Sequence, residues 1–411
     1  MLKLSKYNYY STIDIDNYIL FNTFSGAIIR IDHRIYDLLQ NKFEELTDDE
    51  INVLENLGIL IEEDFDEYKV IELDRIKSMC SSETVTYRIL TTTACNARCF
   101  YCYEKNIVSD KMDLQTACAI VKFIKGNTAA TNKIKIQWFG GEPLLNTDVI
   151  YYITENIIEY CKETGKEYEF SMVSNGLLVD TVEIERMVLK QVQISLDGSE
   201  SEYNRRKNYL NYDNAFHRVI NNIKYLLEKD ISVSVRLNYD KDNLDSIKAL
   251  IVELSKTIVK KDKFNIYPYP LFGTYFKHKN CNDNPTDEKD YLNLLILLNE
   301  HNFLTKKQLT QLDYRPYRCF ACNSNSFVIN TNGDLAKCTV NIDSKVGTVH
   351  KGVIFNEEYF KWCSSKIAEK CESCIFLPLC QGGCMAGQLG SHSVTCFMKK
   401  DIIDELLKLI C

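Results

Sequence analysis

Residues 87–102 read YRILTTTACNARCFYC, an apolar run that ends in three closely spaced cysteines. Cys95, Cys99 and Cys102 form the pattern Cys-x3-Cys-x2-Cys. Three thiolates are one short of the four that close a 4Fe-4S cluster, so one iron would keep a free coordination position, as open catalytic metal sites do. The segment therefore predicts a strand that ends in a loop able to hold an open metal cluster.

Composition limits the classes of protein to which the chain can belong. Its 411 residues are 45% hydrophobic, which is enough for a large core in two or three domains. The formal net charge is −8 and no basic tract is present, so we expect neither nucleic acid nor membrane as a partner. The first ten residues lack the apolar core of a signal peptide, and no run reaches the roughly 18 apolar residues of a spanning helix. These features predict a cytoplasmic protein, in which many cysteines indicate metal rather than disulfides.

Nine of the seventeen cysteines fall between residues 319 and 396, and all of them except Cys363 are regularly spaced. These eight follow the patterns Cys-x2-Cys-x10-Gly-x4-Cys and Cys-x2-Cys-x5-Cys-x3-Cys-x11-Cys, and they are Cys319, Cys322, Cys338, Cys371, Cys374, Cys380, Cys384 and Cys396. Eight is two sets of four, so the eleven grouped cysteines fit one open and two closed clusters. Structural zinc is the alternative, because Cys-x2-Cys pairs also suit tetrahedral zinc. We interpret the six single cysteines as small buried hydrophobes: Cys80, Cys118, Cys161, Cys281, Cys363 and Cys411.

Between the two cysteine groups, the hydrophobic period switches repeatedly between strand and helix. Short β-branched or apolar runs predict strands at residues 87–93, 134–139, 169–173, 192–196, 231–237 and 264–267. Apolar residues at helical spacing predict helices between them, at residues 149–160, 215–227 and 244–258. Alternating strands and helices predict an α/β fold with a parallel sheet. An open doubly wound sheet is the alternative, but no Gly-x-Gly-x-x-Gly follows the first strand.

Polar or glycine-rich segments follow the predicted strands, at the edge where barrel enzymes collect their functional groups. Gly140-Gly141-Glu142-Pro143 follows the second strand. Its two glycines would let the backbone approach a ligand closely, and Glu142 would add charge or brace the loop. Ser174 follows the third strand, and Ser195 and Asp197 follow the fourth; ordinary turns are the alternative for all three. Arg236, inside the fifth strand, needs an anion, supplied by a ligand or by a carboxylate of the barrel.

The first seventy residues do not share this pattern. Residues 13–31 predict strands, with alternation at Ile13 and Ile15. A helix at residues 35–39 follows, and Thr47-x-x-Glu50 predicts a capping box that opens a second helix. The acidic stretch at residues 62–67 predicts an exposed linker.

The cysteine loop and the Gly140–Pro143 segment resemble the signatures of the radical S-adenosylmethionine (SAM) superfamily. The resemblance implies a partial (β/α)6 TIM barrel in which SAM chelates the open iron and is cleaved by one electron to a 5'-deoxyadenosyl radical. It implies that Cys95, Cys99 and Cys102 hold the catalytic cluster and that Tyr101 contacts adenine. The implied SAM contacts are completed by Gly140, Gly141, Glu142 and Pro143 at the ammonium, by Ser174, Ser195 and Asp197 at the ribose or carboxylate, and by Arg236 at the carboxylate.

The cysteine-rich C-terminal region resembles the SPASM extension, which holds two auxiliary 4Fe-4S clusters. Gly333 and Cys338 fit the Gly-x4-Cys of that family. By that resemblance Cys319, Cys322, Cys338 and Cys384 would hold the first cluster, and Cys371, Cys374, Cys380 and Cys396 the second. The N-terminal region resembles the winged-helix-like, PqqD-like domains of radical SAM peptide maturases, which implies binding of a leader peptide at a sheet edge. A packing domain without a ligand is the alternative.

Together these resemblances divide the chain into a PqqD-like domain (1–70), a radical SAM partial barrel (84–300) and a SPASM domain (310–411). They imply an enzyme that abstracts a hydrogen from a ribosomally made precursor peptide and installs an oxidative modification, a thioether or other crosslink. Three 4Fe-4S clusters and SAM would be its cofactors. A reducing donor such as flavodoxin or ferredoxin would be a partner.

Two other functions compete with this hypothesis. Anaerobic sulfatase-maturating enzymes, which form formylglycine, have Asp after the Gly-x4-Cys cysteine and Tyr two residues after the last radical SAM cysteine; this chain has Thr339 and Glu104 there. Glu104 would instead act as a base near the site or pair with Arg98. A non-enzymatic iron–sulfur electron-transfer protein would have no need of the Gly140–Pro143 segment.

Overall fold

The computed structural model describes residues 1–104, 108–259, 262–271, 288–304, 312–316, 319–364, 366–391, 396 and 399–410. The chain divides into two compact units. One joins Met1–Met79 with Thr305–Cys319 and Lys366–Cys411, and the other joins Cys80–Leu304 with Phe320–Ser365. The predicted domain boundaries stay predictions. Among the described helices, none combines the length and apolar character that crossing a membrane requires.

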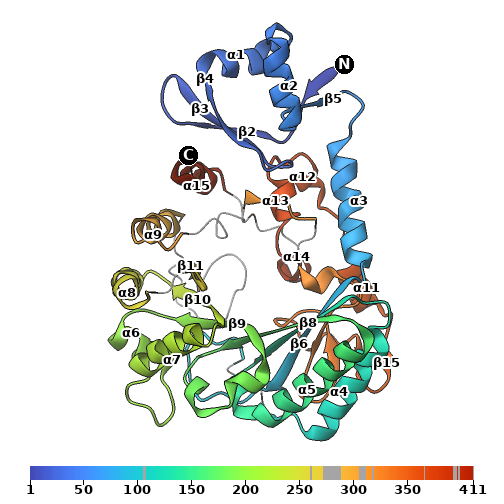
Figure 1. The fold of residues 1–411 in the computed structure, drawn as a ribbon, viewed down its shortest axis with the longest axis vertical. Helices are drawn as coiled ribbons and strands as arrows, with labels where there is room; N and C mark the ends of the chain where they lie inside the picture. The colour runs from blue at the N-terminus through green and yellow to red at the C-terminus, as the bar shows by residue number, and fades with distance from the viewer. Residues whose placement is uncertain are drawn as a thin grey trace. The chain divides into compact units, whose positions relative to one another are not determined.

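A six-stranded parallel sheet forms the centre of the second unit (Figure 1). Its strands are β6 (Thr84–Thr92), β7 (Lys133–Gly140), β8 (Glu167–Ser174), β9 (Leu189–Leu196), β10 (Ser232–Tyr239) and β11 (Phe264–Pro270). Each pairs with its neighbours in sequence, in the order β11-β10-β9-β8-β7-β6. A doubly wound sheet would reverse this order partway. The unbroken order is that of a partial barrel, which confirms the predicted fold class and all six predicted strands.

The strands of this sheet alternate between apolar and polar side chains. On the outer face Ile89, Ile136, Trp138, Ile194 and Val235 are at most 1% exposed. The inner face carries half-buried polar residues, among them Arg88, Gln137, Ser171, Gln193 and Arg236. Parallel strands are usually apolar on both faces because both are buried. Here the inner face keeps hydrogen-bonding groups, so the lumen of the partial barrel is polar.

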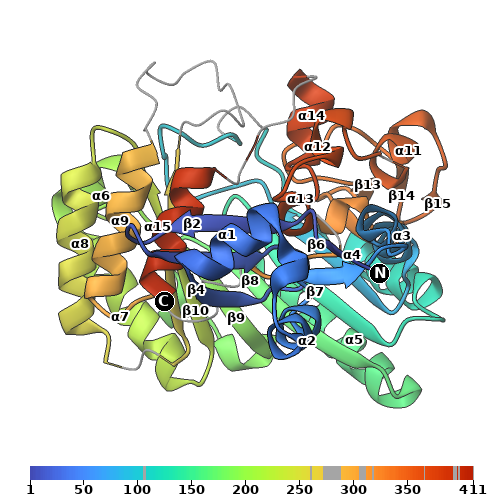
Figure 2. The same cartoon turned by 90° about the horizontal axis from the view of Figure 1, so that it is seen from above.

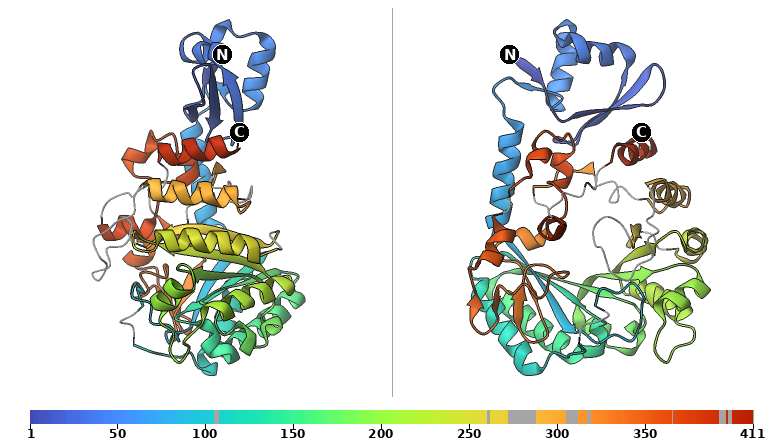
Figure 3. Two further views of the ribbon diagram at one scale, coloured as in Figure 1. Left: turned by 90° about the vertical axis from the view of Figure 1, so that its left-hand side faces the viewer. Right: turned by 180° about the vertical axis from the view of Figure 1, so that it is seen from behind.

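Helices cover the outer face of the sheet (Figure 3). They are α4 (Leu114–Asn127), α5 (Thr147–Thr164), α6 (Glu200–Lys207), α7 (Phe216–Glu228), α8 (Leu244–Thr257) and α9 (Glu288–Glu300), with single turns η2 (Pro143–Asn146), η3 (Val179–Thr181) and η4 (Ile184–Met187). The predicted helices at residues 149–160, 215–227 and 244–258 correspond to α5, α7 and α8. Helices α8 and α9 run side by side at the β11 end of the sheet (Figure 2). The start of α4 is capped by Asp113, whose side chain accepts from the Thr116 amide at 2.7 Å.

A small antiparallel extension continues the sheet beyond β6. Strand β12 (Phe327–Ile329) pairs with β6 in parallel, and β13 (Asp334–Ala336), β14 (Gly347–Thr348) and β15 (Gly352–Val353) follow antiparallel. The turn η6 (Phe320–Cys322) precedes them and α11 (Glu357–Cys363) follows. Gly333, with φ of 81°, makes the β12–β13 turn. The predicted Gly-x4-Cys segment is therefore a hairpin attached to β6, the strand that leads into the N-terminal cysteines.

The N-terminal region builds two small sheets and two helices. Strand β1 (Leu2–Leu4) pairs with β5 (Leu60–Glu62), and β2 (Asn8–Thr12), β3 (Asn17–Asn22) and β4 (Ile28–Asp32) form an antiparallel sheet. Helices α1 (His33–Asn41) and α2 (Asp48–Asn56), with the turn η1 (Phe43–Glu45), supply the rest of a core that includes Leu20, Leu39 and Leu54. The predicted capping box is confirmed, because the Glu50 amide donates to Thr47 Oγ1 at 3.3 Å and the Thr47 amide to Glu50 Oε2 at 2.9 Å.

The prediction that Ile13 and Ile15 lie in a strand is wrong. Both lie in the turn between β2 and β3. Asp14 Oδ1 accepts hydrogen bonds of 2.9 Å from the amides of Asp16 and Asn17. This local aspartate turn overrides the alternation of apolar residues.

The prediction of an exposed linker at residues 62–67 is also wrong for its last residue, Glu67. Glu67 is only 4% exposed and begins α3 (Glu67–Cys80), a helix that the sequence analysis missed. Its carboxylate accepts hydrogen bonds from Ser5 Oγ at 2.5 Å and from the Lys6 amide at 3.0 Å. Charge density predicted exposure, but two nearby donors let this carboxylate be buried. The same unit holds α12 (Glu369–Glu372), α13 (Leu377–Cys380), α14 (Met385–Ser391) and α15 (Lys400–Ile410).

The alternation of the central strands predicts unequal effects of alanine on the two faces. Ile194→Ala should lower the free energy of unfolding by about 2–5 kcal/mol, because Ile194 is fully buried on the outer face. Gln191→Ala, on the half-buried inner face of the same strand, should change it by less than about 0.5 kcal/mol. Urea unfolding followed by circular dichroism measures both. Equal losses would contradict the assignment of the two faces.

Candidate active site

The cysteine loop that follows β6 is held on two sides by backbone hydrogen bonds. On one side, the Gly141 amide donates to Thr92 O at 3.0 Å and the Glu142 amide to Ala94 O at 2.9 Å. On the other side, the connection after α6 contacts the loop, because the Arg98 amide donates to Lys207 O at 2.9 Å. The loop is thus placed at the carboxyl edge of the sheet, as predicted from the sequence.

Gly140 and Gly141 are required by close packing of two backbones. A Cβ atom at Gly140 would overlap the carbonyl oxygen of Thr92, and one at Gly141 would overlap that of Ala94. Gly140 also has a φ of 127°, a backbone conformation that residues with a Cβ atom rarely adopt. The glycines therefore fit against the cysteine loop itself.

Glu142 braces the loop, one of its two predicted roles. Its carboxylate is fully buried and accepts hydrogen bonds from the Leu144 amide (3.1 Å), Ser174 Oγ (2.9 Å) and the Asn175 amide (2.8 Å). Burial raises the pKa of this carboxyl to about 7. The contacts join the loops after β7 and β8. Pro143, which is also buried, begins η2 and accepts from Thr91 Oγ1 through its carbonyl at 3.3 Å.

The three loop cysteines lie close enough for their charges to interact. Burial raises the pKa of Cys95 to about 12, and the nearby Glu142, Cys99 and Cys102 add to the shift. Burial also raises the pKa of Cys99 and Cys102, against which the Lys207 charge acts. Within the described residues no three Cys, His, Asp or Glu side chains are arranged to hold one metal ion. The donor set of three thiols on one loop, beside a buried cation, nevertheless fits a cluster of several irons with net negative charge.

Asn175 is a contact that the sequence analysis did not single out. Its side-chain amide donates to Asn96 Oδ1 at 2.7 Å and lies 3.9 Å from Cys95 Sγ. The neighbouring Ser174, which was singled out, donates to Glu142 instead. Asn-Gly pairs are common in turns, and only the fold brings this amide to the cysteine loop.

Asp197 is at the centre of a buried polar network. Its carboxylate accepts from Tyr101 Oη at 2.5 Å and from Asn238 Nδ2 at 3.0 Å, and its backbone oxygen accepts from Asn243 Nδ2 at 2.7 Å. Ser195, two residues earlier on β9, accepts from Lys207 Nζ at 2.6 Å. The predicted residues Tyr101, Ser195 and Asp197 are thus brought together. The Tyr101 hydroxyl joins the network rather than pointing to solvent.

Lys207 is the functional candidate that the sequence analysis missed. Its side chain is 3% exposed, donates to Tyr101 Oη at 3.0 Å and lies 3.6 Å from Asp197 Oδ1. Burial is the largest single effect and lowers the pKa of Lys207, but the negative charges of Asp197, Cys99 and Cys95 together outweigh it, so the pKa lies above its usual value. In the sequence, Lys207 follows Arg205 and Arg206 and has no motif that marks it as buried.

The arginine that precedes Lys207 fixes the end of α6. Arg206 is 1% exposed and makes two hydrogen bonds to Asp240, of 2.7 and 2.8 Å. Its guanidinium also lies 5.3 Å from the centre of the Phe100 ring in the cysteine loop. The bidentate pair therefore sets the position from which Lys207 reaches the site.

Arg236 lies on the inner face, opposite Ser195 of β9. Its guanidinium lies 3.5 Å from the centre of the Tyr269 ring. Its buried Nε has no hydrogen-bond partner, and no carboxylate of the described residues pairs with it. The sequence predicted that either a ligand or a carboxylate of the barrel would compensate Arg236. Among the described residues, no such carboxylate is found.

Glu104 does not pair with Arg98 in the described structure. Arg98 Nη1 donates to the backbone oxygens of Cys95 and Ala97 instead, at 2.6 and 2.8 Å. Glu104 is 8% exposed, and burial raises the pKa of its carboxyl to about 7. The predicted pairing of Glu104 with Arg98 is thus wrong.

The C-terminal cysteines fall in both units. Cys322 and Cys338 belong to the unit of the sheet, and the others belong to the N-terminal unit. The Cys371–Cys384 run folds as consecutive turns, in which the Cys374 amide donates to Cys371 O at 3.1 Å and the Gly383 amide to Cys380 O at 2.9 Å. Cys396 is exposed. The division of these residues into two cluster sets stays a prediction.

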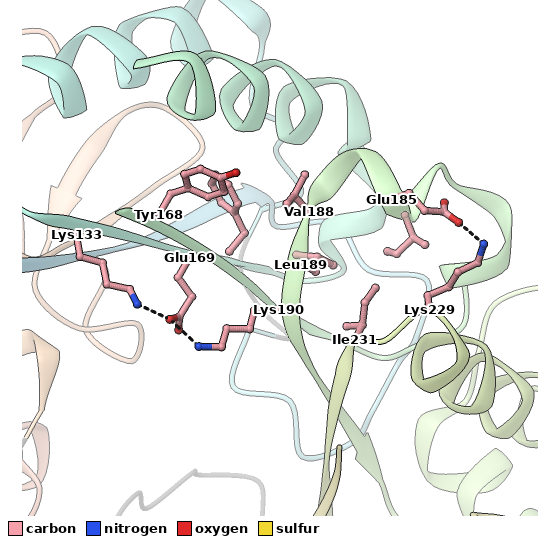
Figure 4. Close-up of a pocket in the computed structure, with 11 residues that line it drawn as sticks. Lys133, Tyr168, Glu169, Glu185, Val188, Leu189, Lys190, Lys229 and Ile231 are labelled. Atoms are coloured by element: carbon pink, nitrogen blue, oxygen red, sulfur yellow. Dashed lines mark hydrogen bonds and ion pairs between the residues drawn. The ribbon is translucent and has the colours of Figure 1, made fainter. Parts of the chain in front are cut away.

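A pocket of about 420 Å³ lies at the opposite, amino edge of the sheet (Figure 4). Lys133 and Lys190 flank Glu169 there, at 3.1 and 3.3 Å, and Lys229 pairs with Glu185 at 2.6 Å. Its charges already pair with one another. The pocket contains none of the predicted site residues.

Residues 89–254 match the family model of the Radical SAM superfamily. This segment spans β6 to α8 and includes the cysteine loop and the Gly140–Pro143 segment. The chain is a radical SAM enzyme, with the 4Fe-4S cluster and SAM of that class as cofactors.

Among individual proteins, the chain is similar to the radical SAM cyclopropyl synthase TigE of Paramaledivibacter caminithermalis. The two are 24% identical over 100% of this chain and 94% of TigE. Two solved structures share the fold. The structure of anSMEcpe with bound AdoMet has a TM-score of 0.60 at 16% identity and covers 79% of this chain and 96% of the other. The structure of Streptococcus suis SuiB has a TM-score of 0.53 at 18% identity and covers 94% of this chain and 96% of the other. SuiB has also been solved with its precursor peptide SuiA, and that structure matches with a TM-score of 0.50 at 18% identity over 95% and 97%.

Gly141→Ala should displace the cysteine loop, because the new Cβ would overlap a backbone oxygen that cannot rotate away. We expect SAM binding to the reconstituted protein to weaken at least about tenfold, a loss of about 1.4 kcal/mol. Equilibrium dialysis with labelled SAM measures this. Gly126→Ala on α4, where nothing lies within 4 Å of the new Cβ, is the matched control. Unchanged SAM binding in Gly141→Ala would show that the two loops need not pack this closely.

Lys207→Met should lower the reduction potential of the loop cluster by several tens of millivolts, because a nearby buried cation stabilises the more negative reduced state of the cluster. For one electron, about 59 mV corresponds to about 1.4 kcal/mol. Lys207→Arg should restore most of the potential. A redox titration followed by electron paramagnetic resonance measures it. Lys190→Met, whose side chain is 70% exposed, is the control. A potential that stays at the wild-type value would exclude an electrostatic role for Lys207.

Proposed function

We propose that this radical SAM enzyme oxidatively modifies a ribosomally made precursor peptide. The observation that carries the proposal is the packing of the cysteine loop against Gly140 and Gly141 at the carboxyl edge of a partial barrel whose lumen is polar. A polar lumen suits a substrate rich in amide groups, such as a peptide. Similarity to TigE over the whole chain, and to SuiB and anSMEcpe in fold, supports it.

The cofactors supply a 5'-deoxyadenosyl radical that takes a hydrogen atom from the substrate. In this proposal Cys95, Cys99 and Cys102 bind the cluster. The backbone of Gly140 to Pro143 lies beside SAM, and Ser174 and Glu142 keep that backbone in place. Tyr101, Ser195 and Asp197 position the adenosine, with Lys207 as their buried counter-charge.

Arg236 is proposed to bind the SAM carboxylate. Its buried Nε lacks a partner among the described residues, and its ring contact with Tyr269 leaves the guanidinium as a positive group on the lumen face. Burying such a group is costly unless an anion compensates it.

The eight C-terminal cysteines are proposed to hold two closed auxiliary clusters. Cys319, Cys322, Cys338 and Cys384 form the first set, and Cys371, Cys374, Cys380 and Cys396 the second. Four thiolates on each cluster leave no iron open to substrate. Their role is then to accept the electron that the substrate radical loses when the new bond forms. A flavodoxin or ferredoxin of the cytoplasm supplies the electron that starts the cycle.

The N-terminal sheet is proposed to bind the leader segment of the precursor. Strand β4 is the edge of its three-stranded sheet and pairs only with β3 among the described strands. Ile28 and Ile29 on β4 are half-buried. An extended leader could add to this edge through backbone hydrogen bonds.

The bond formed can be a crosslink between two residues or a ring within one residue. A ring closure is the chemistry named for TigE. Either product requires the loss of two hydrogens: one leaves as an atom to the adenosyl group, and the other leaves as a proton and an electron. Formylglycine formation is disfavoured, because Thr339 and Glu104 occupy the positions at which that family has Asp and Tyr.

Coexpression with a short peptide encoded beside the gene should give a peptide lighter by two hydrogens per modified site. Tandem mass spectrometry distinguishes a crosslink, which joins two residues, from a ring, which alters one. Replacing Cys95, Cys99 and Cys102 together by Ala should abolish the change and leave about eight of about twelve irons. Replacing Cys118 and Cys161 by Ala, on the outer helices, is the control and should keep both. Zinc in place of iron, or no 5'-deoxyadenosine with intact clusters, would contradict the proposal.

A further inference from the structure

Asn175 lies where β8 ends, beside the cysteine loop, and is 9% exposed. Its backbone is held from two sides. The Asn175 amide donates to Glu142 Oε2 at 2.8 Å, and its carbonyl oxygen accepts from Tyr209 Oη at 3.3 Å. The side chain therefore extends from a fixed point of the backbone.

The side-chain amide of Asn175 has a defined orientation. Its Oδ1 accepts from the Leu177 amide at 3.0 Å, and because a backbone N–H can only donate, the NH2 group must lie on the other side. Nδ2 donates one hydrogen to Asn96 Oδ1 at 2.7 Å and lies 3.9 Å from Cys95 Sγ. An NH2 group carries two hydrogens, so the second one is left for the sulfur.

Asn96, which accepts the first hydrogen, is also held in place. Its carbonyl oxygen accepts from the Leu210 amide at 2.8 Å, and a β-bridge joins Ala97 to Tyr209 in the same contact. Both partners of the Asn175 side chain are thus anchored by the backbone. The second hydrogen needs no rearrangement to face Cys95.

Cys95 Sγ is approached by a second amide. The Ala97 backbone amide donates to it at 3.4 Å. A cysteine that binds iron is a thiolate, and a charged acceptor forms stronger hydrogen bonds than a neutral thiol. The two N–H groups are therefore placed to serve the sulfur in its iron-bound state.

Hydrogen bonds to ligand sulfurs change how readily an iron–sulfur cluster is reduced. One electron from an external reductant raises the negative charge of the cluster by one unit, and part of that charge lies on the sulfurs. An N–H group that points at a sulfur stabilises the reduced cluster more than the oxidised one. The effect is stronger at a buried residue such as Asn175, because little solvent screens it.

We propose that the Asn175 side chain donates a hydrogen bond to the Cys95 thiolate of the loop cluster and thereby raises the reduction potential of that cluster. Asn175 is then a positioning residue that acts through Cys95. Its effect comes from one oriented N–H bond, whereas Lys207 acts through its charge. The inference rests on the cluster of the radical SAM class and does not require a peptide substrate.

Asn175→Ala removes the N–H group and leaves the charge unchanged. We expect the equilibrium constant for one-electron reduction of the loop cluster to fall about tenfold, which is a drop of about 59 mV. Asn175→Asp keeps the shape of the side chain and the acceptor for the Leu177 amide, but a carboxylate oxygen replaces the NH2 group, so the constant should fall further. A redox titration of the reconstituted enzyme, followed by electron paramagnetic resonance, measures both. The signal of the loop cluster is the one that changes when SAM is added.

Asn222→Ala is the matched control. Asn222 is 3% exposed, and its Nδ2 donates to the backbone oxygens of Gly176 and Leu177 at 2.8 and 3.2 Å, so it braces the loop that carries Asn175. Its hydrogen-bond partners include no cysteine. This variant should keep the wild-type potential, which separates loss of the hydrogen bond to sulfur from loosening of the loop.

A second measurement detects the bond itself. Enzyme that carries the heavy nitrogen isotope in its asparagine side chains should show coupling of that nitrogen to the reduced loop cluster in pulsed electron paramagnetic resonance without SAM. The coupling should weaken in Asn175→Asp and persist in Asn222→Ala.

Three results would each overturn the inference: an unchanged potential in Asn175→Ala, an equal drop in Asn222→Ala, or undiminished nitrogen coupling in Asn175→Asp. Loss of the loop cluster from both Asn175 variants would overturn it as well, because Asn175 would then hold the loop together rather than set the potential.

Discussion

The close approach of two backbones, Gly140–Gly141 against Thr92–Ala94, is the constraint on which the candidate active site depends. Side chains at either glycine would overlap carbonyl oxygens of the cysteine loop, so the approach requires hydrogen in place of Cβ. The approach places the cysteine loop over the ends of β6 and β7. Glu142 then extends the contact to β8, because its buried carboxylate accepts two hydrogen bonds from Ser174 and Asn175. A loop that binds a reactive cofactor is thereby fixed by the scaffold rather than by the cofactor alone.

The lumen of this partial barrel is lined by polar side chains rather than by a packed apolar core. A closed parallel barrel fills its interior with branched apolar side chains. Here the apolar side chains point outward to the helices, and the inner face keeps groups such as Gln137 and Gln191 in contact with solvent. The fold therefore does not depend on packing of the lumen. Its stability comes from the outer face, so the polar side chains of the inner face are not needed to build the core.

Buried charges beside the cysteine loop are compensated in pairs. Arg206 binds Asp240 with two hydrogen bonds, and Lys207 lies 3.6 Å from Asp197. Removing one member of such a pair leaves an uncompensated charge, which is more costly than losing the pair's attraction. The pairs set the orientation of Tyr101 and Ser195 as well, since Lys207 donates to both. Positioning, more than net stabilisation, is what these charges provide.

The sequence by itself determined the order of the elements and the residues with strong local signatures. The cysteine triplet, the Gly140–Pro143 segment and the six strands follow from spacing and periodicity, because those signals are local. Tertiary structure decided which role each group has. Lys207 follows two arginines and looks like a solvated helix end, yet the fold buries it against Asp197. Asn175 looks like a turn residue, yet it reaches the cysteine loop. Contacts between residues distant in sequence depend on how strands pair and helices cross, and no local pattern records them.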